Sequence, residues 1–210
     1  MENNFESLHD NKLGIMDLGM LKQAEKDIVT TKIKMVFNKM PYIPSVLYLI
    51  DLHKFLFEDI YGFAGKIRTN VIYKEEDVLL RDSVKYSMPE DILSDLEKVF
   101  NKIKTSDLES ASREEFIDFT VNMLVDIWKI HPFREGNTRT SLVFLRTFLH
   151  HYGYDFDIDF FKHKGTFDYM RTSLVVASYE AEDLGVKRNY NYANKIIEDI
   201  ISKSNYQKRK

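Results

Sequence analysis

The segment from His131 to Arg139 has the residue types and spacing needed for chemistry on phosphate groups. An imidazole has an ordinary pKa of about 6.5, so His131 can take a proton from a hydroxyl near neutral pH. A carboxylate beside bound phosphate is costly unless a cation lies between them, and Glu135 therefore suggests Mg²⁺. The guanidinium of Arg139 is a permanently charged, forked donor that suits phosphate oxygens.

Between these side chains, the pair Gly136-Asn137 predicts a turn whose backbone can bind an anion. Both residue types tolerate positive φ, so successive N–H groups can point inward as a nest. A helix that begins just after the turn adds the positive end of its dipole. A base, a metal carboxylate, a phosphate nest and an arginine together indicate phosphoryl or nucleotidyl transfer.

Two helices must position this segment. Ser112 and Glu115 form a capping-box pattern, and apolar residues follow them at three- and four-residue steps. That helix should run straight into His131. The next helix is expected at 139–152, so that the segment lies between the end of one helix and the start of another.

The rest of the chain is also helical in pattern. Apolar periodicity predicts five further helices, at about 14–37, 46–61, 88–104, 166–183 and 190–203. Residues 66–81 interrupt it with weakly alternating, β-branched positions, which favour a short β-hairpin. The expected fold is an all-α single domain with one small hairpin.

Composition excludes several classes of protein. A length of 210 residues with 44% apolar residues predicts one sizeable core, and a net charge of −3 argues against nucleic-acid binding. No apolar run is long enough for a membrane span, and the polar start lacks a secretory signal. The chain has no cysteine, which removes disulfides and thiolate sites. We therefore expect a cytoplasmic protein without membrane or nucleic-acid partners.

The segment HPFREGNTRTSL at 131–142 resembles the signature of the Fic family (Fic/Doc superfamily), which reads H-x-F-x-D/E-G-N-G-R-x-x-R. A second block at 52–68 is similar to the family's helix that ends in an aromatic-Ala-Gly-x-x-Arg turn before a flap. The likeness covers about 12–200. It implies one Fic domain over 1–210, an all-α Fic-fold helical bundle with one β-hairpin flap, a polar N-terminal segment and a basic C-terminal tail.

The resemblance implies a protein adenylyltransferase. His131 would deprotonate a Ser, Thr or Tyr hydroxyl of a target protein, whose oxygen would attack the α-phosphorus of ATP and release pyrophosphate. Glu135 would hold Mg²⁺. Flap residues within about 66–81 would align an extended segment of the target.

The same resemblance implies a nucleotide cradle at the start of the next helix. The backbone of Gly136 to Thr138 would hold the β-phosphate. The side chain of Asn137 would fix the loop, and the guanidinium of Arg139 would neutralise the outer phosphates.

The chain departs from the signature at two positions. Thr138 replaces a glycine, and a left-handed conformation there would cost about 1–2 kcal/mol. Leu142 replaces the second arginine, and Arg146, four residues further along the same helical face, is an alternative source of that charge.

Both departures resemble the Doc branch, whose members transfer the γ-phosphate. A Doc-like kinase of a toxin–antitoxin pair and a degenerate nucleotide-binding module are therefore the alternatives to AMP transfer. Many members of the family are inhibited by a glutamate that pairs with the second arginine of the signature. This chain lacks that arginine, so such a glutamate would have no partner. A separate antitoxin-like inhibitor protein, or no inhibition of this type, then remains.

Overall fold

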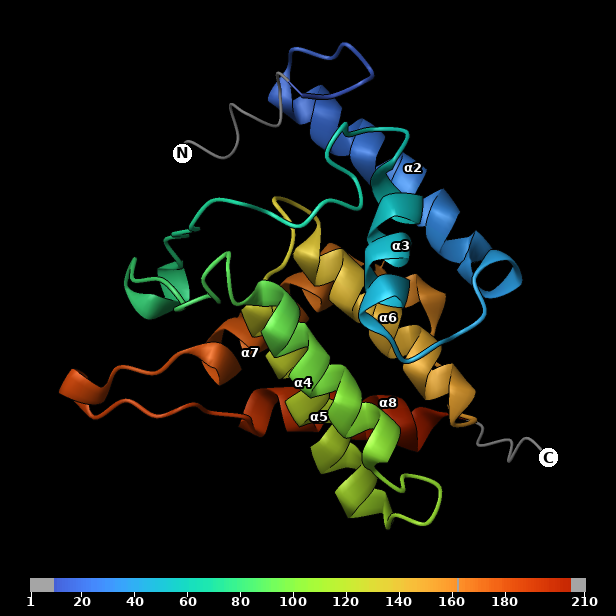
Figure 1. Cartoon of the computed structure of the whole chain (residues 1–210), viewed down its shortest axis with the longest axis vertical. Coiled ribbons are helices and arrows are strands. Elements are labelled where there is room, and N and C mark those ends of the chain that lie inside the picture. The colour runs from blue at the N-terminus through green and yellow to red at the C-terminus, as the bar shows by residue number, and fades with distance from the viewer. Residues whose placement is uncertain (1–9, 162, 205–210) are drawn as a thin grey trace.

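The computed structural model describes residues 10–161 and 163–204, so the expected polar start (1–9) and the end of the basic tail (205–210) lie outside the described residues. The described chain is an all-α bundle (Figure 1). Its helices are α2 (Leu18–Lys39), α3 (Val46–Phe57), α4 (Ile92–Thr105), α5 (Arg113–Ile130), α6 (Asn137–His151), α7 (Lys164–Ser178) and α8 (Asn191–Lys203). Short 3₁₀ turns lie at η1 (Asp77–Leu79), η2 (Ile158–Phe161) and η3 (Glu182–Leu184).

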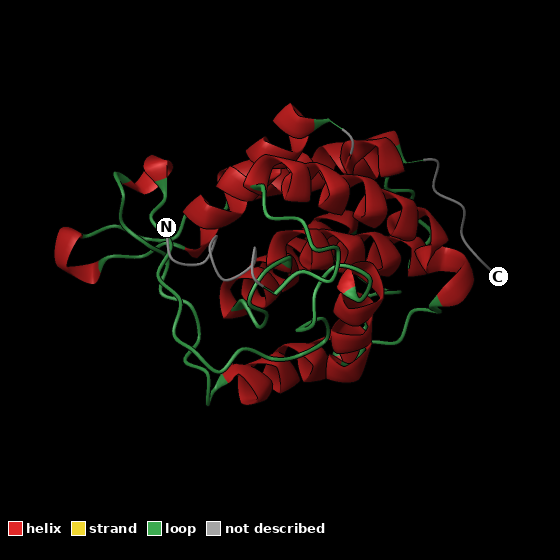
Figure 2. Cartoon of the chain, turned by 90° about the horizontal axis from the view of Figure 1, so that it is seen from above, coloured by secondary structure: helices red, strands yellow, loops and turns green. Residues whose placement is uncertain are grey.

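Helices α5 and α6 form the centre of the bundle. α5 packs against α4, α6, α7 and α8, and α6 also packs against α3. Figure 2 shows the described chain as helices and loops, with no strand drawn. Four consecutive residues of α6, from Leu142 to Leu145, are fully buried, which places this helix inside the core rather than on its surface. Among the described residues, no helix is both long enough and apolar enough to cross a membrane.

The two helices around the chemical segment confirm the expected arrangement. The side chain of Ser112 accepts from the N–H of Glu115, and the Glu115 carboxylate accepts from the N–H of Ser112, so the capping box starts α5. The helix ends at Ile130, and His131 follows in the left-handed conformation with φ of 52°. α6 starts at Asn137, two residues earlier than expected.

The expected β-hairpin at 66–81 is the part of the fold that the structure corrects. No strand is assigned within the described residues, and the only pairing of Ile67 is an isolated bridge with Phe133. Residues 66–91 instead form a longer excursion with η1 at its tip, which we call the flap loop. Its arms are joined by the N–H of Glu76, which donates to the carbonyl of Asp82 at 3.0 Å, rather than by a ladder.

Polar side chains of the flap loop bond to α7 and to the residue that follows it. The carboxylate of Glu76 is buried and pairs with Arg171 of α7 at 2.6 Å. The hydroxyl of Tyr179, just after α7, donates to Asp82 at 2.6 Å. The flap loop is therefore attached to α7 by its side chains.

Candidate active site

His131 lies where α5 ends, and its ring is 3% exposed. Its Nδ1 lies 3.2 Å from the carbonyl oxygen of Trp128. A carbonyl only accepts hydrogen bonds, so Nδ1 carries the proton and Nε2 carries the lone pair. Within the described residues, Nε2 is buried and has no hydrogen-bond partner. The structure thus presents an unpaired basic nitrogen at the end of α5.

Aromatic rings and cations surround this imidazole. The ring of Tyr86, from the flap loop, lies 4.3 Å from it, and Trp128 packs at right angles at 5.4 Å. Burial holds the pKa of His131 well below its ordinary value, and the positive charge of Lys74 adds to that effect. His131 is therefore neutral at pH 7 and able to accept a proton.

The side chain of Asn137 closes the loop that follows. It accepts from the N–H of Phe133 at 2.8 Å and donates to the carbonyl of Phe133 at 2.6 Å. Gly136 adopts φ of 81°, and a Cβ there would lie 2.5 Å from the ring of Phe57. Only glycine fits this position, and the first N–H groups of α6, which lack acceptors within the helix, open beyond it. These N–H groups are where the sequence predicts an anion nest, and we call the Gly136 turn and the first turn of α6 the nest.

His53 of α3 contacts the loop between α5 and α6. It is fully buried in α3, its Nδ1 accepts from the N–H of Gly65 at 2.9 Å, and its ring stacks on Phe133 at 3.8 Å. The proton is therefore on Nε2, which donates to the carbonyl of Glu135 at 3.0 Å. Burial lowers the pKa of His53 to about 4, so the ring is neutral and the bond persists at neutral pH.

The side chain of Glu135 is half-buried on this fixed backbone. Among the described residues, no group of three or more His, Cys, Asp or Glu side chains could hold a metal ion. Mg²⁺ is commonly bound through one or two carboxylates together with substrate phosphates. A single carboxylate at an anion nest therefore fits a magnesium ion that arrives with a nucleotide.

The prediction of a strained, left-handed conformation at Thr138 is wrong. This residue lies inside α6, in right-handed helical conformation, so the strain expected at this position is absent. The helix starts at Asn137, and the left-handed residue is Gly136. The hydroxyl of Thr138 accepts from the indole N–H of Trp128 at 2.9 Å, which ties the nest to the end of α5.

Arg139 has a partner that the sequence did not reveal. It forms an ion pair with Glu25 of α2, and the hydroxyl of Tyr61 donates to the same carboxylate. Glu25 is 8% exposed, whereas the Arg139 side chain is 26% exposed and lies 5.0 Å from the ring of Phe57. The sequence does contain a signal for this buried acid, because Glu25 stands between Leu21 and Val29 in the apolar stripe of α2.

Neither position considered for the second arginine contributes charge to the nest. Leu142 is fully buried in the core. Arg146 stacks on Phe37 at 3.9 Å, and its Nε donates to the carbonyl of Phe156 at 3.0 Å. The hypothesis that Arg146 replaces the missing arginine is therefore wrong.

Arg68 connects the flap loop to the chemical segment. It is 4% exposed, and its Nε donates to the carbonyl of His131 at 2.7 Å. Its Nη1 donates to the carbonyl of Asn70 at 2.6 Å, and its Nη2 reaches the carbonyl of Ser87. The N–H of Arg68 also donates to the carbonyl of Pro132 at 2.9 Å. One side chain thus binds both arms of the flap loop to the end of α5.

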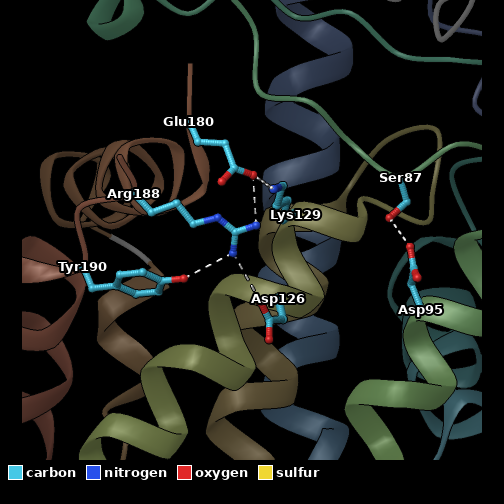
Figure 3. A network of polar contacts seen from close by, with 7 residues as sticks. All are labelled: Ser87, Asp95, Asp126, Lys129, Glu180, Arg188 and Tyr190. Atoms are coloured by element: carbon cyan, nitrogen blue, oxygen red, sulfur yellow. Dashed lines mark hydrogen bonds and ion pairs between the residues drawn. The ribbon is translucent and has the colours of Figure 1, made fainter. Parts of the chain in front are cut away.

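Three further hydrogen bonds involve the flap loop and the loop around η3 (Figure 3). The hydroxyl of Ser87, in the flap loop, donates to Asp95 of α4 at 2.8 Å. Glu180 accepts from Lys129 of α5 at 2.8 Å and from Arg188 at 3.3 Å. These bonds hold the flap loop against α4, and the loop around η3 against α5, at whose end His131 lies.

Sequence comparisons identify curated relatives. The chain is 34% identical over 108 residues to a probable protein adenylyltransferase of Sinorhizobium fredii, which covers 50% of this chain and 53% of the relative. It is 24% identical over 144 residues to a probable protein adenylyltransferase Fic of Salmonella typhimurium, covering 69% and 68%. The chain therefore spans about half the length of the Sinorhizobium relative.

Solved structures share the fold. A VirB-translocated effector of Bartonella tribocorum with bound AMPPNP matches with a TM-score of 0.74 at 22% identity, over 94% of this chain and 92% of that one. The N-terminal Fic domain of a Bartonella quintana effector with bound ADP matches with a TM-score of 0.73 at 21% identity, over 90% and 88%. The model of the Fic/DOC family matches residues 44–149, just over half of the 210 residues. On this evidence, the chain belongs to the Fic/DOC family.

Proposed function

We propose that the protein is an adenylyltransferase that moves AMP from ATP to a hydroxyl of a target protein. The observation that carries the proposal is the Nε2 of His131, a neutral nitrogen with a free lone pair on the residue just after α5. The names of the curated relatives favour AMP transfer, and two structural neighbours were solved with AMPPNP or ADP.

In this mechanism His131 acts as the general base. Its Nε2 takes the proton of a Ser, Thr or Tyr hydroxyl while that oxygen attacks the α-phosphorus of ATP. The bond from the α-phosphorus to the bridging oxygen breaks, and pyrophosphate leaves. The carbonyl of Trp128 stabilises the protonated ring by accepting from Nδ1. His131 must lose its cover by Tyr86 for the target hydroxyl to reach Nε2.

The start of α6 holds the phosphates. Backbone N–H groups of Asn137 and Thr138 and the side chain of Arg139 provide donors, and the helix dipole adds favourable potential. Glu135 would hold Mg²⁺, which neutralises phosphate charge when it is bound. The bonds from His53 and Asn137 keep the backbone of this loop in place before the nucleotide arrives.

The flap loop is the proposed docking place for the target. Its first arm is bridged to the chemical segment at Ile67 and, further on, exposes Val71 and Tyr73, where no strand partner is assigned among the described residues. An extended peptide can add to such an edge through main-chain hydrogen bonds. We therefore expect the target to present its hydroxyl within an extended segment.

Labelling identifies which phosphate moves. The protein is incubated with Mg²⁺, a lysate and ATP labelled at either the α- or the γ-phosphate. AMP transfer predicts protein labelling from the α-label alone, and His131→Ala should abolish it. Labelling from the γ-label alone would establish the Doc-like kinase instead. Labelling from neither, with ATP still bound, would leave a nucleotide-binding module.

A further inference from the structure

A cavity of about 270 Å³ lies beside Arg139, on the side facing α2. Three helices form it: α2 contributes one face, α6 contributes Arg139, and α7 contributes its first turn. The lining residues are Lys26, Val29, Thr30 and Ile33 of α2, Arg139, and Lys164 and Phe167 of α7. We call this cavity the α2 pocket.

The α2 pocket is apolar at its base and cationic at its rim. Val29 and Ile33 are 1% exposed, whereas Lys26 and Lys164 are exposed. No carboxylate lines the cavity, and within the described chain no acid pairs with either lysine. Two ammonium groups without an acidic partner surround this hollow together with a guanidinium that is shared with Glu25, and the two ammonium groups attract a polyanion.

Arg139 connects this cavity to the nest. It belongs to the first turn of α6, whose N–H groups form the nest, and its side chain also lines the α2 pocket. Glu25 holds one side of the guanidinium, and a quarter of the side chain remains accessible. A phosphate chain that starts at the nest can therefore continue past Arg139 towards Lys26 and Lys164.

We propose that the α2 pocket binds the outer phosphates of the nucleotide, which leave as pyrophosphate. This rests on the function proposed above and adds two residues, Lys26 and Lys164, to the nucleotide site. Both lie outside residues 44–149, the part of the chain that matches the family model. The same chemistry would suit a separate phosphate-bearing ligand, and the experiment distinguishes the two sources.

Binding is measured by calorimetry on the full chain with AMPPNP, AMP and inorganic pyrophosphate as probes. The double variant Lys26→Gln/Lys164→Gln should bind AMPPNP and pyrophosphate about tenfold more weakly, since an exposed ion pair contributes up to about fivefold for each lysine. AMP, which lacks the outer phosphates, should change by less than about twofold. Lys34→Gln removes the same charge from an exposed position of α2 that does not line the pocket, and should leave all three affinities unchanged.

A second titration identifies the source of the phosphate. If the pocket holds the nucleotide's own phosphates, saturating AMPPNP should prevent pyrophosphate from binding. Pyrophosphate binding of unchanged affinity to the AMPPNP-saturated protein would overturn the proposal in favour of a separate ligand. Equal loss of AMP and AMPPNP binding, or no loss of either, would overturn it as well.

These outcomes are independent of the transfer reaction. Lysine-dependent AMPPNP binding without transfer of the α-label would support the pocket and contradict the adenylyltransferase. Transfer of the α-label, together with AMPPNP binding that does not depend on the lysines, would support the adenylyltransferase and contradict the pocket.

Discussion

The imidazoles of His53 and His131 are held in opposite tautomers by the backbone groups that they face. His53 carries its proton on Nε2, because its Nδ1 accepts from the N–H of Gly65. His131 carries its proton on Nδ1, because that nitrogen faces the carbonyl of Trp128. One ring therefore donates to the loop that carries Glu135, and the other keeps a lone pair for chemistry.

Acid should destabilise the protein before its carboxylates titrate. The pKa of His53 falls to about 4 in the folded chain, and that of His131 is also lowered, whereas an unfolded histidine titrates near pH 6.5. The unfolded state then binds more protons below pH 6.5, so stability is complete above that pH and is lost as pH falls towards 4. His53 alone should lower the free energy of unfolding by about 2 kcal/mol between pH 7.5 and 5.

Urea unfolding at several pH values measures this loss. His53→Gln, which cannot be protonated in this range, should unfold with a weaker pH dependence. An equal dependence in the variant would show that His53 is not the group responsible.

The ring of Tyr86 should control the pKa of His131, because burial is the main cause of the lowered value. Tyr86→Ala admits water and should raise this pKa towards 6.5, whereas Tyr86→Phe keeps the ring and should leave it low. NMR titration of the imidazole checks both variants. If the pKa of His131 stays low in Tyr86→Ala, then Trp128 and the protein interior, rather than Tyr86, keep water away from the imidazole.

Gly136→Ala should damage the nest by two separate effects. Positive φ costs about 1 kcal/mol, and the contact of the new Cβ with Phe57 adds about 1–3 kcal/mol. Gly185→Ala is a matched control, since Gly185 has φ of 65° but no atom within 4 Å of its would-be Cβ. Denaturant unfolding should therefore show a clearly larger loss for Gly136→Ala, and similar losses would rule out the contact with Phe57.

Thr138→Gly should not improve the nest, although it restores the residue of the family signature. The change removes the bond from Trp128 and places glycine in a helix, which together cost about 1–2 kcal/mol. Thr138→Ser retains the hydroxyl and should behave like the native chain. Unfolding and α-label transfer measure the effect, and faster transfer by Thr138→Gly would contradict this account.

Arg68→Lys should loosen the flap loop. A lysine cannot reach the carbonyls of both Asn70 and His131, and the loss of charge-assisted bonds to buried groups costs about 2–3 kcal/mol. Hydrogen exchange should accelerate across the flap loop and at the start of the chemical segment. Arg81→Lys changes an exposed arginine near the flap tip and should leave that exchange unchanged.

Features that depend on nearby residues were predictable from the sequence. The capping box of Ser112 and Glu115 and the apolar periodicity after it located α5 to within a residue, because capping is local. The turn at Gly136 was predicted for the same reason. The all-α fold followed from this periodicity along the chain.

Features that depend on distant residues were not predictable. The strain assigned to Thr138 assumed that the helix began at Arg139, but α6 already begins at Asn137, and the Thr138 hydroxyl bonds to Trp128 of the preceding helix. The flap loop is attached to α7 by the pair of Glu76 with Arg171, a contact that no local pattern encodes. His53 and Glu25 stand within apolar stripes of their helices, and only the fold shows which buried group each one meets.

The chain contains a single tryptophan, and the fold has placed it at the centre of the site. The indole of Trp128 donates to Thr138 in the nest and packs at right angles against His131. Indole emission responds to its hydrogen bond and to nearby charge, and here it arises from one position only. Its intrinsic fluorescence therefore offers a direct test of the proposed nucleotide binding without attaching a dye.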